Sequence, residues 1–203
     1  MSHIDLDHID DTYYDILKEL GNIGAGNATT ALSVMVNSKV DMSVPKVALL
    51  DFNNITQYIG SEETILMGIL FMLDGDIRGM MMFLMDLESA RHLINRLTGS
   101  EGGSGEFNEM ELSAMQEIGN IISGAYISSL ATLTNMKIAT SVPSLSIDMA
   151  GALLSIAAIE FGKIGDKVLM IQTNFGEDDF VKGYFLLIPE LQSYDKILGS
   201  LGI

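Results

Sequence analysis

The chain has 203 residues, of which 48% are hydrophobic, so it is long enough to form one domain with a substantial core. Its 27 acidic and 11 basic side chains give a formal net charge of −16 at pH 7. Such an acidic surface repels nucleic acid and anionic lipid. The chain contains no cysteine, which excludes disulfides, thiolate nucleophiles and cysteine-based zinc sites and fits a reducing cytoplasm.

Neither a signal peptide nor a membrane span is expected. The segment MSHIDLDHIDD at residues 1–11 is acidic and has no apolar stretch. The longest apolar run, residues 65–73, is too short to cross a bilayer and indicates a buried strand. We therefore expect a soluble cytoplasmic protein without membrane insertion.

The first half of the chain predicts a long helix, strands and a closing helix. Apolar residues recur three and four positions apart from about Asp11 to Asn37, which indicates a helix despite its glycines. The turn at Asp74–Gly75 predicts a hairpin between two of the strands. The strands and the closing helix are expected at residues 47–52, 64–73, 77–85 and 86–97.

The second half predicts the same order of elements. Asn108 and Glu111 form a capping-box pattern that begins a helix running to about Asn135. A strand near 145–148, a helix within 149–161, a hairpin of 167–174 with 180–188 and a last helix near 191–201 follow. Strands joined by hairpins and flanked by helices predict an α+β fold with an antiparallel sheet.

The chain is an internal duplication. A shift of 98 residues, which places Glu19 on Glu117, aligns residues 15–45 with 113–143 without a gap. We expect tandem-duplicated helix–antiparallel strands–helix units, about 11–98 and 108–202, related by a pseudo-twofold axis and forming one compact domain over 1–203. The Gly/Ser-rich segment 99–107 is the expected flexible joint. Identical aligned positions include Gly21/Gly119, Asn22/Asn120, Gly26/Gly124 and Pro45/Pro143.

Each predicted long helix carries the same polar group. Asp15, Glu19 and Asn22 stand at i, i+4 and i+7, so they share one face within roughly 60° of arc. Taken alone, such a group is most often a solvated helix face. The repeat favours a functional site, because Glu, Gly and Asn match in both copies while neighbouring positions differ. The second copy consists of Ser113, Glu117 and Asn120.

Glycines and prolines accompany both polar groups. A helix-interior glycine costs roughly 1 kcal/mol relative to alanine, so Gly21 and Gly119 are expected to let a partner's backbone approach. Tight helix packing stays open as the alternative for Gly24 and Gly26. Pro45 and Pro143 are expected at the entry to a strand, where they fix the turn into the sheet.

The residue types indicate positioning chemistry on a phosphoryl group supplied by another molecule. An asparagine amide is neither base nor nucleophile, but it can hold a water in line, as a glutamine does in GTPases. A carboxylate beside a phosphoryl group needs a cation, and Lys18 is the one basic residue within a turn of Glu19. We therefore expect cation, metal and phosphoryl group on a partner, with Asn22 and Asn120 aligning water and Glu19 and Glu117 binding a partner lysine.

Other sites have weaker signals. The order G-x-x-G-x-G after a helical segment does not fit a dinucleotide loop, and no GK[ST] follows. His3, His8 and His92 lack metal-ligand spacing, so no metal or cofactor site is expected in this chain.

The pattern [DS]-x3-E-x2-N-x22-P, present twice, resembles the signature of the CheC family, the CheY-phosphate phosphatases of bacterial and archaeal chemotaxis, which also includes CheX and FliY. The resemblance covers essentially the whole chain. It implies removal of the phosphoryl group from the phosphoaspartate of the response regulator CheY, with Mg2+ bound by CheY. It also implies a second partner, the receptor deamidase CheD. A FliY relative would carry an added C-terminal domain, for which we expect no room before Ile203.

Alternatives to this interpretation remain open. Asp148 differs from Leu50 at the matching place of the first half, so residues 144–152 are the candidate CheD contact; a strand-end acid facing water is the other explanation. The chain could also be a non-catalytic adaptor or sequestering module for CheY or CheD, or a FliY-like component associated with the flagellar switch.

Overall fold

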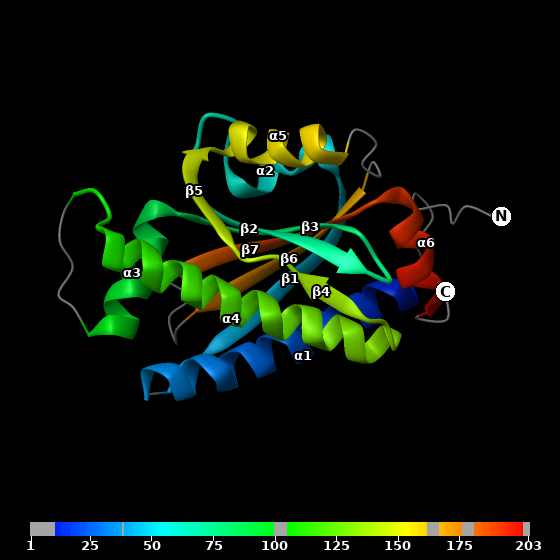
Figure 1. The fold of residues 1–203 in the computed structure, drawn as a ribbon, viewed down its shortest axis with the longest axis horizontal. Coiled ribbons are helices and arrows are strands. Elements are labelled where there is room, and N and C mark those ends of the chain that lie inside the picture. Colours follow the sequence, from blue (N-terminus) through cyan, green and yellow to red (C-terminus); the bar gives the residue numbers. More distant parts are fainter. Residues whose placement is uncertain (1–10, 38, 100–104, 162–166, 176–180, 201–203) are drawn as a thin grey trace.

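A seven-stranded antiparallel sheet forms the centre of the computed structural model, which describes residues 11–37, 39–99, 105–161, 167–175 and 181–200. Figure 1 shows two long helices side by side over one face of the sheet, a shorter helix over the other face, and one helix at each end. The helices are α1 (Asp11–Val36), α2 (Thr56–Ile59), α3 (Leu87–Thr98), α4 (Glu109–Thr134), α5 (Ala150–Phe161) and α6 (Leu191–Ser200).

The strands run in the order β1-β6-β7-β3-β2-β4, and β5 also pairs with β2. The first long strand of each half therefore pairs with a strand of the other half, β1 with β6 and β5 with β2, while β3 and β7 meet at the centre. A pseudo-twofold axis between β3 and β7 relates these pairings, which supports the proposed repeats. The strands are β1 (Met42–Asp51), β2 (Ile65–Gly75), β3 (Gly79–Asp86), β4 (Ile138–Thr140), β5 (Ser144–Met149), β6 (Lys167–Phe175) and β7 (Val181–Pro189).

The predicted α+β fold is confirmed, with differences at particular elements. The capping box of Asn108 and Glu111 begins α4 as expected, with both reciprocal hydrogen bonds formed. The short strand β4 and the turns of helix within residues 52–59 were not predicted. Most of the predicted joint, residues 100–104, lies outside the described residues, as do His3 and His8.

The place predicted for Pro45 is wrong, whereas that for Pro143 is confirmed. Pro143 directly precedes β5, but Pro45 lies inside β1, which begins at Met42. Within the part of the chain that the structure describes, β1 pairs only with β6, and its register shifts between Ser43 and Lys46. A residue without an N–H is tolerated in an edge strand at such an irregularity.

The core between the long helices and the sheet is centred on stacked aromatic rings. Phe83 and Phe185 stack with centroids 4.5 Å apart, and Tyr126 from α4 lies 4.5 Å from Phe185. The Tyr126 hydroxyl also shares a 3.0 Å hydrogen bond with Thr173 of β6, which is fully buried. These contacts fix the Tyr126 ring from two sides.

Tyr126 is expected to titrate well above an ordinary tyrosine. Burial raises the pKa of its hydroxyl to about 12, against the lowering effect of the Thr173 hydrogen bond. Because the unfolded chain ionises this group near pH 10, its contribution to stability is complete below pH 10 and is lost as the pH rises through about 12. Ultraviolet absorbance should show a phenolate transition near pH 12 that Tyr126→Phe removes, separate from that of Tyr194, whose pKa is also raised by burial; ionisation of Tyr126 together with the exposed tyrosines would contradict the burial.

Candidate functional site

Both predicted polar groups lie on the outward surfaces of the long helices. Glu19 and Asn22 of α1 are exposed, and so are Glu117 and Asn120 of α4. Among the described residues, none of these four side chains has a hydrogen bond or an ion pair, so each carboxylate and each amide is available to another molecule. Asp15 and Ser113, one turn before each glutamate, are exposed as well.

The two groups form separate sites. Figure 1 shows α1 and α4 side by side and running in opposite directions. They contact each other near Asn27, whose amide donates to Ser129 at 3.1 Å, and near Gly24, which faces Tyr126. Asn22 and Asn120 precede these contacts in their own helices, so they lie on opposite sides of the helix–helix contact. The molecule therefore presents two similar polar surfaces on one face.

The predicted role of Gly21 and Gly119 is wrong. Both glycines are buried against the protein's own sheet. A Cβ on Gly21 would lie 3.2 Å from side-chain atoms of both Val44 and Val47 in β1, and one on Gly119 would overlap Ile69 of β2. These glycines let the helices lie close to the strands, so they cannot receive a partner.

The other helical glycines fall into two groups. Gly24 confirms the packing alternative, because a Cβ there would overlap the Tyr126 ring. Gly26 and its counterpart Gly124 are exposed, and a Cβ on either would have no neighbour within 4 Å. The packing alternative for Gly26 is therefore wrong. Gly26 and Gly124 match in both copies and stand four residues after each asparagine, on the same face.

The strand entry of the second half is tied to the second site. The Gln116 side chain, next to Glu117, donates a 3.2 Å hydrogen bond to the Pro143 carbonyl oxygen. This bond joins the start of β5 to α4 beside the exposed pair. The motif proline of this half thus acts on the backbone that supports the site and does not belong to the reactive surface.

Asp148 lies apart from both polar pairs. It is exposed in β5 opposite Leu66, whose side chain belongs to the core cluster on the α5 side of the sheet. Directly opposed residues of an antiparallel pair point to the same face, so Asp148 points away from α1 and α4. Its strand neighbours Ile147 and Met149 are 38% and 48% exposed, which leaves an apolar border at this sheet edge.

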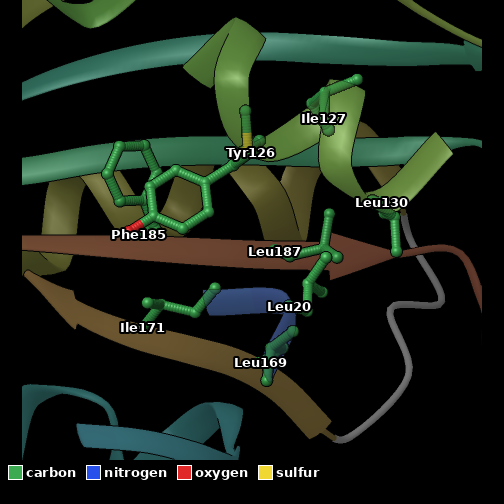
Figure 2. A pocket seen from close by; sticks show the side chains of 9 residues that line it. Leu20, Tyr126, Ile127, Leu130, Leu169, Ile171, Phe185 and Leu187 are labelled. Atoms are coloured by element: carbon green, nitrogen blue, oxygen red, sulfur yellow. The ribbon is translucent and has the colours of Figure 1, made fainter. Parts of the chain in front are cut away.

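A small pocket lies on the inner side of the helix pair, between the helices and the sheet. Figure 2 shows Leu20, Tyr126 and Phe185 pointing into it, and its remaining lining is aliphatic or methionine. None of the residues that line this pocket has a carboxylate or amide side chain, so the pocket is part of the core packing beneath the sites. Among the described residues, no three His, Asp or Glu side chains gather to hold a metal ion. In the same residues, no helix is both long and apolar enough to span a membrane.

The fold and the repeated polar pairs define a class of α+β proteins with two open helix-surface sites. A family model for CheC-like proteins matches residues 14–49 and 110–147, once in each half. The chain is 33% identical to the CheY-P phosphatase CheC of Bacillus subtilis over 195 aligned residues. The alignment covers 93% of each protein. The chain belongs to the CheC-like family, which confirms the resemblance identified from the motif.

Solved structures share this fold. FliY of Thermotoga maritima matches with a TM-score of 0.73 and 20% identity over 96% of this chain and 98% of that one. CheX of Borrelia burgdorferi, in a complex with CheY, BeF3 and Mg2+, matches with a TM-score of 0.51 and 17% identity over 90% of this chain and 99% of that one. At these identities the matches establish the architecture.

Proposed function

We propose that this chain is a protein phosphatase that hydrolyses the phosphoaspartate of phosphorylated CheY during chemotaxis adaptation. The observation that carries the proposal is the repetition of an exposed Glu–Asn pair on two helices, in a relative of a CheY-P phosphatase. Both pairs are exposed, and neither has a hydrogen bond or an ion pair among the described residues. A site that acts on a partner protein requires such exposed side chains without intramolecular bonds, and both copies have them.

The proposed chemistry is hydrolysis with the reacting groups divided between two proteins. The amide of Asn22 or Asn120 holds a water in line with the phosphorus, the water oxygen forms the new bond, and the bond to the aspartyl oxygen breaks. The products are phosphate and the free aspartate of CheY. Glu19 or Glu117 pairs with a lysine of CheY and fixes the orientation of the two proteins.

The charge of this chain supports that division. With 27 acidic and 11 basic residues, it is poorly suited to neutralise a phosphoryl group itself. Mg2+ neutralises charge on the phosphoryl oxygens. We assign this ion to CheY and propose no cofactor for this chain. A solved complex of a CheX with CheY contains BeF3 and Mg2+, which is in keeping with the assignment.

Phosphate release from phosphorylated CheY tests the proposal directly. CheY-P decays at its own rate when alone, and substoichiometric amounts of this chain should accelerate the decay with turnover. An adaptor or sequestering module would bind CheY-P without accelerating its decay, and that result would end the phosphatase proposal. A component of the flagellar switch would instead co-purify with switch proteins.

CheD is the proposed second partner, and the edge around residues 144–152 is the proposed contact. Asp148 is exposed there on the sheet face away from the polar pairs, while its strand neighbours Ile147 and Met149 are exposed on the opposite face. Asp148→Arg should weaken CheD binding about tenfold by placing a cation where the contact uses a carboxylate, while CheY-P hydrolysis without CheD should not change. Titration calorimetry measures the first and phosphate release the second. Unaltered CheD affinity would remove Asp148 from the interface.

A further inference from the structure

Gly26 and Gly124 have no explanation inside the molecule. Each is exposed in the middle of a long helix, and a Cβ on either would have nothing within 4 Å. Alanine would be better than glycine by roughly 1 kcal/mol at an exposed helical position. Gly21, Gly24 and Gly119 differ, because a neighbouring side chain would obstruct a Cβ at each.

The exposed side chains next to these glycines are also small. The Thr30 hydroxyl, one turn after Gly26, turns back to donate a 3.0 Å hydrogen bond to the Gly26 carbonyl oxygen. In the second helix the matching position is Ser128, a small exposed residue whose carbonyl oxygen accepts a 2.8 Å hydrogen bond from the Thr132 hydroxyl. After each asparagine the outward face thus continues with two small exposed residues, Gly26 and Thr30 in α1 and Gly124 and Ser128 in α4.

The short asparagine side chain explains why small residues are needed beside it. The asparagine amide extends only a short way from its helix, and residue i+4 stands beside it on the same face. A longer side chain at i+4 would project beyond the amide and hold a docking protein away. Glu19, on the other side of Asn22, can be longer because a carboxylate can enter the partner's surface and pair with a cation.

We propose that Gly26 and Gly124 are positioning residues of the two sites, at which the backbone of phosphorylated CheY comes against the helix so that the adjacent asparagine reaches the phosphoryl group. This inference rests on the proposed function and adds the contact that sets the approach distance. The two glycines lie beside the proposed catalytic groups, so the phosphorylated regulator bound there is the occupant.

The test replaces each glycine by glutamine while catalysis at the other site is removed. The variants are Gly26→Gln in an Asn120→Ala background and Gly124→Gln in an Asn22→Ala background. Glutamine favours helix and meets no neighbour within 4 Å of its Cβ, so the fold should be as stable as the parent's or more stable. CheY-P hydrolysis in these backgrounds should fall about tenfold, the scale of an overpacked contact. Binding of beryllofluoride-activated CheY should fall about tenfold when both glycines are replaced together, Gly26→Gln/Gly124→Gln, because an asparagine variant still binds CheY at its other site.

Gly199→Gln is the matched control, because Gly199 is an exposed glycine of α6 that also has nothing within 4 Å of a Cβ. It should leave binding and hydrolysis unchanged. Parental hydrolysis in Gly26→Gln and Gly124→Gln, with parental binding when the two are combined, would overturn the inference, as would lost hydrolysis with full binding. If the wild-type chain does not accelerate CheY-P decay at all, the proposed function fails instead, and the binding measurement still decides the role of the glycines.

Discussion

The double variant Asn22→Ala/Asn120→Ala is expected to lose about a hundredfold of the catalysed rate of CheY-P hydrolysis, the scale measured when one positioned polar group is removed from a transition state. Both amides are exposed and lack protein partners among the described residues. The free energy of unfolding should therefore change by less than about 0.5 kcal/mol. Phosphate release measures the rate, and chemical denaturation measures the stability.

The single variants separate the contributions of the two sites. The sites lie on different helices, so their contributions should add: the losses of Asn22→Ala and Asn120→Ala together account for the whole catalysed rate. Affinity for activated CheY should remain near that of the wild type, because asparagine acts mainly on the water and the phosphoryl group. A double variant that hydrolyses CheY-P normally would refute the catalytic role of both residues.

Much of the fold follows from local patterns in the sequence. The long helices follow from apolar positions three and four apart, and the capping box of Asn108 and Glu111 marks the start of α4. The hairpin of β2 and β3 follows from Asp74–Gly75, where Gly75 takes a positive φ of 111°. Such features are set by residues close in the sequence, and for that reason they can be predicted from it.

Long-range pairing could not be predicted in the same way. The strand β4 has only Ile138–Thr140, and it exists because the end of β2 offers unpaired backbone groups. The pairing of β1 with β6 and of β5 with β2 across the halves depends on which edges are open after β3 and β7 meet. No turn signal connects these strands, since they are far apart in the chain.

At the site, the sequence predicted the polar pairs but assigned the glycines to the wrong face. Gly21 follows Leu20 and stands four residues after Leu17, and both leucines are 4% exposed. That spacing already places Gly21 in the inward stripe. Gly26, four residues after Asn22, shares the outward face. The angular position of each glycine around the helix axis separates the packing positions from the exposed ones. Its distance along the sequence from the polar pair does not.

Two glycines only two positions apart in α1 are therefore expected to respond to alanine with opposite signs. Gly24→Ala should destabilise the protein by about 2–3 kcal/mol, since the new methyl group overlaps the Tyr126 ring. That ring has little room to yield, because it packs on Phe185 and is bonded to Thr173. Gly26→Ala should raise the free energy of unfolding by up to about 1 kcal/mol, because the methyl group meets only solvent.

Denaturant unfolding of both variants measures the two effects, and a double-mutant cycle assigns the cause. Tyr126→Leu removes the ring that Gly24→Ala would overlap, so the alanine should cost much less in that background, with a coupling of at least about 1 kcal/mol. Gly26→Ala should show no coupling with Tyr126→Leu. A full cost of Gly24→Ala without the ring would mean that α1 does not pack on α4 at this point, and the separation of the two sites across that contact would have to be abandoned with it.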